Sequence, residues 1–419
     1  MKKLLTFLSI IVIITFAFSI NTFGIVVDNE EVELTSKYKN VILFIGDGMG
    51  PNHVDAGGIY LGRDLCFDVT DENWTYHAYS NTDSRTSQAF PLDESKSLIR
   101  PDLNNSLYDG TPSPYDPSVS LGTSGDLTTY TDSAAGGTAL ATGVKVTNGR
   151  IALDIDGKPL ENLVEIAKDL NKKTGVITSD EINGATPSSF LTHIPSRHET
   201  SEILKGIATS KADLVMGKAS SVYKESKDWY NDLYSSNGFE VFNQKEEIKS
   251  TINKVMGIFP GVASKDDPRI PSLRELTIYA LDYLDNEEGF FLMVEGANID
   301  NQSHSNQAKL MLNELLGFNE AIEAAMEWAS GRDDTLMVVT ADHETGGLYY
   351  DRTNTNQLNI VNNIRWLSMN HSRTRVDIAV YGNIDNYINK YGNNFKTLEN
   401  LPYWDNTDVF KLCSWHLTN

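Results

Sequence analysis

Cysteine is scarce in this sequence of 419 residues, which contains only Cys66 and Cys413. Because the two lie far apart along the chain, they provide neither a zinc knuckle nor a framework of disulfides. One disulfide between them and two free thiols are both compatible with the sequence. The hydrophobic content of 40% is instead sufficient for a sizeable core, as in a globular enzyme.

Positive charge is also in short supply, with 35 Lys and Arg residues against 57 Asp and Glu residues and a formal net charge of −22. A chain of this sign is not expected to bind the backbone of nucleic acids. Its acidity bears on solubility rather than on fold. The sequence therefore disfavours nucleic-acid partners.

Long apolar runs are absent except at the N-terminus, where Lys2 and Lys3 precede an almost unbroken apolar stretch over 4–20. This pattern is typical of a secretory signal. We predict a signal peptide over about 1–24, followed by a single domain over 25–419 and a secreted or periplasmic location. The alternative is an uncleaved membrane anchor, because the stretch approaches the length of a spanning helix.

Short apolar runs elsewhere have the pattern of strands buried on both faces of a parallel sheet. These runs are 41–45, 174–178, 290–294, 336–340 and 376–381. Helical periods over about 160–170 and 307–329 alternate with them, which predicts a doubly wound α/β fold. We expect a mostly parallel central sheet with helices on both faces. The polar stretch of about 71–126 is predicted to be a long surface insertion.

Acidic residues and a histidine follow several of the predicted strands. Asp47 follows the first run, Glu295 follows 290–294, and Asp342 and His343 follow 336–340. In open parallel sheets ligands bind outside the carboxyl ends of the strands, so these side chains are expected to converge. Taken singly, an Asp at such a point is more typical of a helix cap or a turn.

Asp300 and His304 are spaced i, i+4, and on a helix they would lie on one face, close enough to share a metal ion. Glu295 lies just upstream. Carboxylate and imidazole donors together suit zinc, whereas a site with only oxygen donors suits magnesium. A solvated helix face is the alternative interpretation of this pair.

Ser133 lies in a run of small residues, 131–139, that is predicted to lead from a loop into a helix. Its hydroxyl would then lie beside unpaired N–H groups at the positive end of the helix. Because no Gly-x-Ser-x-Gly elbow surrounds it, a nucleophilic Ser133 would have to be activated by metal rather than by a histidine. The alternative is a serine cap on a glycine-rich helix.

Six ordered motifs span most of the chain after the signal. They are Gly-Asp-Gly-Met-Gly around Asp47, Asp132-Ser133-Ala134, Ala185-Thr186-Pro187 with Arg197, Glu295-Gly296 with Asp300 and His304, Asp342-His343-Glu344-Thr345-Gly346-Gly347, and Asn370-His371-Ser372. In content and order they resemble the alkaline phosphatase family. The resemblance implies an alkaline phosphatase-like fold and hydrolysis of phosphate monoesters through a phosphoserine at Ser133. A homodimer that acts on small phosphomonoesters is expected by the same analogy.

The resemblance also implies a set of metal and substrate ligands. The first zinc ion would be held by Asp300, His304 and His371. The second zinc ion would be held by Asp47, Asp342 and His343 and would contact Ser133. Asp47, Thr186 and Glu295 would hold one magnesium ion, and Arg197 would bind two phosphate oxygens, which suits its planar fork.

Two positions differ from the pattern that many relatives show. Gly184 stands where relatives have Asp or His near magnesium, and Asn301 stands where they have Lys, His or Trp near the phosphate. We therefore hypothesise that magnesium binds weakly and that product phosphate leaves fast; submicromolar magnesium affinity would count against this.

Two other functions are weighed against a phosphomonoesterase. The first is a phosphodiesterase or another hydrolase of the same superfamily. The second is a non-catalytic protein that binds phosphate or metal.

Overall fold

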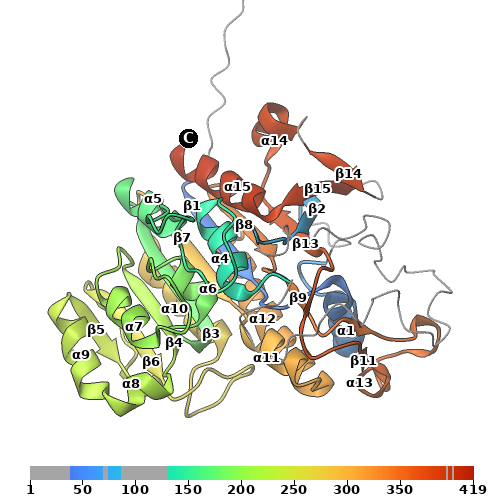
Figure 1. Cartoon of the computed structure of the whole chain (residues 1–419), viewed down its shortest axis with the longest axis horizontal. Helices are drawn as coiled ribbons and strands as arrows, with labels where there is room; N and C mark the ends of the chain where they lie inside the picture. The colour runs from blue at the N-terminus through green and yellow to red at the C-terminus, as the bar shows by residue number, and fades with distance from the viewer. Residues whose placement is uncertain (1–37, 69–73, 86–129, 393–394, 399–400) are drawn as a thin grey trace, which may run out of the picture. The chain divides into compact units, whose positions relative to one another are not determined.

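An 11-stranded sheet forms the centre of the fold (Figure 1). Its strands, in order across the sheet, are β14 (Lys396–Leu398), β15 (Leu401–Asp405), β2 (Tyr76–Asn81), β13 (Val376–Tyr381), β8 (Thr335–Thr340), β1 (Asn40–Ile45), β7 (Phe290–Glu295), β3 (Lys173–Glu181), β4 (Leu214–Lys218), β6 (Lys254–Phe259) and β5 (Phe239–Phe242). All neighbours from β8 to β5 pair in parallel, whereas β13 and β14 run antiparallel to the strands they pair with. The predicted doubly wound, mostly parallel sheet is confirmed.

Strand β1 shows how the sequence produces layers on both faces of the sheet. Its side chains alternate between two hydrophobic clusters, with Val41, Leu43 and Ile45 in one and Ile42 and Phe44 in the other. All are fully buried, and such burial stabilises the fold by about 1.5–3 kcal/mol for each large apolar side chain. A continuous apolar run is therefore what this position requires.

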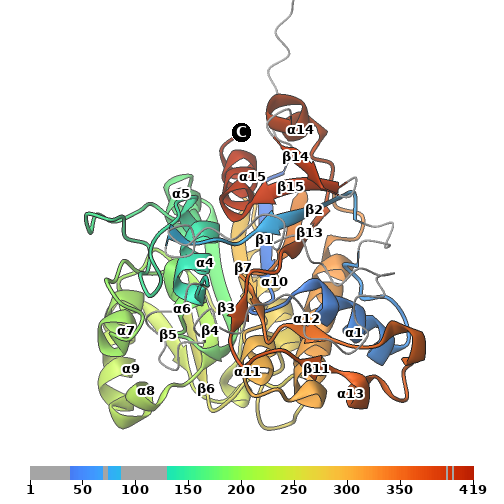
Figure 2. The ribbon, with the colours of Figure 1, turned by 45° about the vertical axis from the view of Figure 1, so that its right-hand side comes forward.

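Helices cover both faces, and Figure 2 shows α4 and α5 on one side of β1 and α1 and α12 on the other. The helices are α1 (Pro51–Leu61), α4 (Ser133–Thr142), α5 (Leu163–Asp169), α6 (Ala185–Ser189), α7 (Thr200–Ala208), α8 (Ser221–Glu225), α9 (Lys227–Ser236), α10 (Leu273–Leu284), α11 (Asn298–His304), α12 (Ala308–Ala329), α13 (Ile360–Asn363), α14 (Asp385–Tyr391) and α15 (Asn406–Thr418). Some of these helices begin at a residue whose side chain caps the helix N-terminus. Ser272, for example, accepts a hydrogen bond from the Glu275 N–H and so caps α10.

Smaller elements lie in the loops. They are the 3-10 helices η1 (Lys245–Glu247) and η2 (Arg352–Asn354) and the short strands β9 (Glu344–Thr345), β10 (Leu348–Tyr349), β11 (Arg365–Trp366) and β12 (His371–Ser372). β9 pairs with β12, and β10 pairs with β11, both antiparallel. The first of these pairs positions part of the site described below.

The computed structural model describes residues 38–68, 74–85, 130–392, 395–398 and 401–419. They belong to one compact unit, Thr35–Asn419. The predicted signal, 1–24, lies outside them, so its role stays a prediction. In the part of the chain that is described, no helix is both long and apolar enough to cross a membrane.

The prediction of a surface insertion over about 71–126 is wrong for its first part. β2 lies within that range and pairs with β13 and β15 in the central sheet. Despite its polar composition, three consecutive residues in the middle of β2, Ala78, Tyr79 and Ser80, are buried. Residues 86–126 of the predicted insertion lie outside the described residues.

Cys66 and Cys413 do not form a disulfide with each other. Both are buried, and they belong to different hydrophobic clusters. Burial raises the pKa of the Cys413 thiol to about 12, so this group is protonated and unreactive in the folded protein. The sequence left open one disulfide or two free thiols, and the structure has two free thiols.

Candidate active site

The acids that follow the strands meet at the carboxyl edge of the sheet. Ile45 at the end of β1 is in register with Glu295 on one side and with Thr340 of β8 on the other. Asp47 and Asp342 each come two residues after their strand, so the three carboxyl groups enter the same region. All three residues are buried, at 7% exposure or less. Their predicted convergence is what the parallel register dictates.

Helix α11 brings Asp300 and His304 to the same region. Asp300 lies in its first turn, and Asp300 Oδ2 is 3.2 Å from His304 Nε2. The other carboxylate oxygen of Asp300 accepts a hydrogen bond from the Thr345 hydroxyl. The i, i+4 spacing therefore places both side chains on one face, as expected, and Thr345 fixes the carboxylate from outside.

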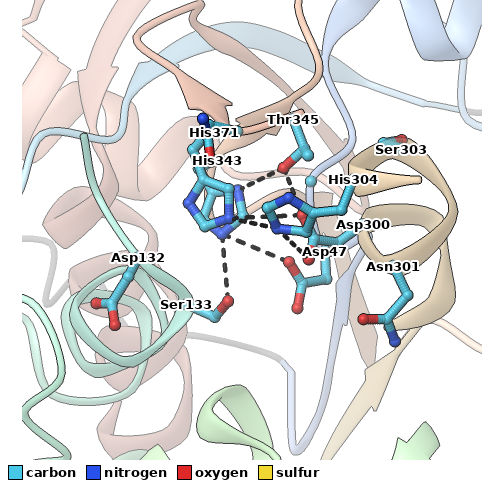
Figure 3. Close-up of polar contacts among 12 residues, drawn as sticks. Asp47, Asp132, Ser133, Asp300, Asn301, Ser303, His304, His343, Thr345 and His371 are labelled. Carbon is cyan, nitrogen blue, oxygen red and sulfur yellow. Dashed lines mark hydrogen bonds and ion pairs between the residues drawn. The ribbon is translucent and has the colours of Figure 1, made fainter. Parts of the chain in front are cut away.

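His371 reaches the site because β12 pairs with β9, which places His371 opposite Thr345. Its Nε2 lies 3.1 Å from His304 Nε2 and 3.6 Å from Asp300 Oδ1. The rings of His371 and His343 stack with centroids 3.6 Å apart. Figure 3 shows the three histidines gathered around the Asp300 carboxylate.

Backbone carbonyls determine which imidazole nitrogens face inward. His304 Nδ1 lies 2.5 Å from the Met369 carbonyl, and His371 Nδ1 lies 2.7 Å from the Thr131 carbonyl. A carbonyl only accepts, so each Nδ1 carries a proton, and each ring turns its Nε2 toward the other ring and toward Asp300. Two Nε2 atoms 3.1 Å apart repel each other unless a proton or a metal ion lies between them.

A proton competes for the same position. Burial alone would lower the pKa of His304, but the hydrogen bond and the charge of Asp300 outweigh it and raise that pKa to about 9. The donor set, a carboxylate and two imidazoles, is one that zinc binds well. Metal binding here is therefore expected to release protons.

A second cluster consists of Asp47, Asp342 and His343, whose ligand atoms all lie within 4.8 Å of one another. His343 Nε2 is 3.5 Å from Asp47 Oδ1 and 3.3 Å from Asp342 Oδ2. Neither of these oxygens has a hydrogen-bond partner among the described residues, although both are buried. Orphaned buried carboxylate oxygens are costly unless a cation compensates them.

Electrostatics support the same conclusion. Burial and the neighbouring carboxylates, with Asp342 first, raise the pKa of Asp47 well above its usual range. Burial and the charge of Asp300 do the same to Asp342, while burial lowers the pKa of His343. The cluster thus combines a neutral imidazole with acids that repel one another, and a divalent ion relieves both effects.

His343 is shared between the two clusters. With Asp300 and His371 it forms another group whose ligand atoms lie within 4.8 Å of one another. By resemblance to the family, His343 was expected to bind only the second zinc ion, together with Asp47 and Asp342. The geometry places its imidazole between the two candidate metal positions.

Ser133 is the first residue of α4, and its Oγ lies 3.3 Å from His343 Nε2. The cap of this helix is Asp132 rather than Ser133, because Asp132 Oδ1 accepts from the Ala135 N–H. The Ser133 hydroxyl is therefore not used for capping and lies at the positive end of the helix beside the second cluster (Figure 3).

Glycines in α4 allow this close approach. A Cβ on Gly136 would lie 2.9 Å from the Asp342 carbonyl oxygen, and one on Gly137 would lie 3.0 Å from the Thr186 Cα. Any larger residue would push α4 away from the loop after β8 and from α6. The small residues around Ser133 are thus required by packing around the site.

Asp132 also positions Arg197, a role that the sequence analysis did not assign to it. Asp132 Oδ2 accepts from Arg197 Nη1 at 3.1 Å and from the Gly149 N–H at 2.9 Å. Burial would lower the pKa of Arg197, but Asp132 and then Asp47 and Asp300 raise it. The guanidinium is therefore held as a cation next to the start of α4. The sequence could have indicated the capping role, because Asp is a preferred N-cap residue directly before Ser133. It has no signal for the contact with Arg197.

Thr186 and Glu295 form the third part of the site. Burial raises the pKa of Glu295 to about 7, and the hydroxyls of Thr178 and Thr186 oppose this rise. Thr178 donates a hydrogen bond to Glu295 Oε2. The Thr186 Oγ1 lies near the carboxylate but completes no hydrogen bond with the described residues, although Thr186 is 1% exposed.

His193 lies four residues before Arg197 but faces elsewhere. Its Nδ1 is 2.9 Å from the Ala152 carbonyl and its Nε2 is 3.0 Å from Glu165 Oε1. Burial would lower its pKa, but these two acceptors raise it. His193 thus fixes the loop before Arg197 to α5 and does not touch the guanidinium.

The sequence profile described as Alkaline phosphatase matches residues 119–217 and 223–401 of the chain, which is more than half of it. The chain belongs to the alkaline phosphatase family. Alkaline phosphatase 4 of Bacillus subtilis (strain 168) is 31% identical over 324 residues, which cover 74% of this chain and 62% of that protein. This member of the family thus spans less than two thirds of the length of that relative.

Solved structures of alkaline phosphatases share the fold of this family member. The Thermus thermophilus enzyme superposes with a TM-score of 0.68 and 22% identity, covering 92% of each chain. A mutant of TAB5 alkaline phosphatase, solved with Mg bound in its M3 site, gives a TM-score of 0.65 and 24% identity over 91% of this chain and 99% of that one. At these identities the likeness establishes the architecture alone.

Proposed function

We propose that the protein hydrolyses phosphate monoesters through a phosphoserine at Ser133, with two zinc ions and one magnesium ion. One observation carries the proposal: beside the Ser133 hydroxyl, inward-facing imidazole nitrogens lie 3.3–3.6 Å from buried carboxylate oxygens. Two of these oxygens, those of Asp47 and Asp342, have no hydrogen-bond partner among the described residues. Membership of the alkaline phosphatase family supports it.

The side chains present fit these ions. Asp300, His304 and His371 would hold the first zinc ion, and Asp47, Asp342 and His343 the second, since both sets mix nitrogen and oxygen donors. Asp47, Thr186 and Glu295 would hold magnesium, because they offer only oxygen. The unpartnered oxygens of Asp47, Asp342 and Thr186 support these assignments.

When bound, these ions supply positive charge that favours an ionised Ser133 oxygen, stabilises the leaving oxygen and lowers the pKa of water. The Ser133 oxygen attacks phosphorus, so that a P–O bond to Ser133 forms while the ester P–O bond breaks and the alcohol leaves with a proton. Water then attacks the phosphoserine, releases phosphate and restores the Ser133 hydroxyl.

Arg197 is the cation of this chain that would hold the phosphate. A guanidinium presents paired N–H donors to two phosphate oxygens and neutralises charge that develops during phosphoryl transfer. Asp132 fixes one end of the guanidinium while capping the helix that carries Ser133. The nucleophile and the phosphate clamp are therefore positioned by the same carboxylate.

A comparison of two chromogenic substrates tests this function against the phosphodiesterase alternative. We expect kcat/KM for p-nitrophenyl phosphate to exceed that for its bis ester by on the order of 10²-fold or more, because a second ester group leaves polar groups of the site unpaired. A preference for the bis ester would favour a diesterase, and turnover of neither would favour a binding protein.

Export and dimerisation also belong to this proposal. The charged start and apolar run at the N-terminus support secretion or a periplasmic location, where small phosphomonoesters would be the substrates. A homodimer is proposed by analogy with the family, and size-exclusion chromatography with light scattering measures it directly.

A further inference from the structure

A chain of polar contacts at the carboxyl end of β3 has no part in the mechanism above. Asp180 Oδ1 pairs with Lys218 Nζ at 2.7 Å, and Asp180 Oδ2 accepts from Asn301 Nδ2 at 2.9 Å. The Asp180 N–H donates to Thr178 Oγ1 at 3.1 Å, and Thr178 in turn donates to Glu295. Asp180 is therefore linked through a single side chain to a proposed magnesium ligand.

The orientation of the Asn301 amide follows from its neighbours. Asn298 Nδ2 donates to the Ser179 carbonyl, so Asn298 turns its Oδ1 toward Asn301, whose Nδ2 lies 3.0 Å away. Asp180 only accepts, so Asn301 uses its amide nitrogen for both contacts. Its Oδ1 is left as an acceptor, and Figure 3 shows this oxygen on the side where Asp47 and Ser133 lie.

An acceptor in this position does not suit a phosphate dianion, whose oxygens are acceptors as well. It suits a group that presents hydrogens. Magnesium demands octahedral coordination and usually keeps several water molecules, which are strong donors. Asp47, Thr186 and Glu295 leave coordination positions for such water, and the buried, unpartnered Thr186 Oγ1 points to a ligand at this end of the site.

We propose that Asn301 Oδ1 accepts hydrogen bonds from the water shell of the magnesium ion and that Asp180, fixed by Lys218, is the positioning residue that holds Asn301 in this orientation. The inference rests on the proposed function, whose magnesium site it completes. It also revises the hypothesis drawn from Gly184, because Asp180 of β3 would hold Asn301 as an outer partner of the magnesium ion although position 184 has no side chain.

Magnesium titration into zinc-loaded, magnesium-free protein, followed by calorimetry without substrate, tests the proposal. Loss of an outer partner of this kind typically weakens metal binding by about 10–100-fold. We expect Asp180→Ala and Asn301→Leu each to raise the magnesium Kd by about 10-fold or more, while the zinc content measured by mass spectrometry stays at the wild-type level.

The matched control is Asp169→Ala, which removes another Asp–Lys pair, with 2.6 Å between Asp169 and Lys211, from an exposed surface. We expect it to leave the magnesium Kd within 2-fold of wild type, because a surface pair of this kind contributes little. A similar rise in Kd in this variant would show that removal of any negative charge is enough to weaken magnesium binding. If Asp180→Ala does not fold, Asn301→Leu, which keeps the side-chain volume, decides the matter.

The proposal is overturned if the wild type binds no magnesium, if Asn301→Leu binds it as tightly as the wild type, or if Asn301→Leu weakens it and a folded Asp180→Ala does not. If the wild type binds no magnesium, the magnesium ion is also removed from the proposed function. The other parts of that function, hydrolysis of the monoester and the role of Ser133, are measured in separate assays and can fail or hold independently.

Discussion

Replacing Ser133 by alanine is expected to lower kcat/KM for p-nitrophenyl phosphate by on the order of 10³-fold or more, because the covalent route is lost with its nucleophile. The Ser133 hydroxyl lies 3.3 Å from His343 Nε2, at the start of α4 and beside the second cluster. Alanine keeps the helix, since its cap is Asp132. Steady-state kinetics at saturating zinc and magnesium provide the measurement.

The control for this variant is Ser414→Ala on α15, where the exposed hydroxyl donates a hydrogen bond to the Lys411 carbonyl, within its own helix. We expect its kinetics to match those of the wild type. Turnover by Ser133→Ala within about 2-fold of wild type would remove Ser133 from the mechanism.

Replacing His343 by alanine is expected to have the second large effect, on metal content and activity together. Its imidazole belongs to both groups of candidate ligands, so its loss weakens two metal positions at once. Metal ions contribute several kcal/mol of charge stabilisation in such reactions, so we expect kcat/KM to fall by about 10³-fold. Zinc per chain, measured by mass spectrometry after dialysis, should fall by at least one ion.

Arg197→Ala provides the contrast for this experiment. Arg197 bonds to Asp132 and is a proposed phosphate ligand, not a metal ligand. The variant should lose substrate affinity and rate while it keeps the wild-type zinc content. Retention of all zinc by His343→Ala, or loss of zinc by Arg197→Ala, would show that the metal ligands are assigned wrongly.

The sequence predicted the core of the fold because β1, β7 and β8 are buried on both faces and so must be continuous apolar runs. It did not reveal β2, because the Tyr, His and Ser residues of this strand have a composition typical of a loop. Only the pairing with β13 and β15 shows that the segment is a strand. Strand pairing of this kind is a tertiary property, and local composition does not record it.

The candidate site shows the same division. Asp47, Asp342 and His343 were predictable because parallel strands end at one edge, and Asp300 with His304 because of helical spacing. The contacts that orient the histidines could not be predicted. The carbonyls of Thr131 and Met369 belong to loops distant in sequence from the histidines they contact, and a backbone carbonyl has no signature in the sequence. The contact of Asp180 with Asn301 could not be predicted either, because only the fold brings these two residues together.

The most direct test is to trap the covalent intermediate. The wild-type protein is mixed with p-nitrophenyl phosphate at low pH, quenched in acid, digested and mapped by mass spectrometry. We predict one phosphorylated residue, Ser133, and no covalent phosphate in Ser133→Ala. Active protein that carries phosphate on another residue, or none under any quench, would contradict the mechanism.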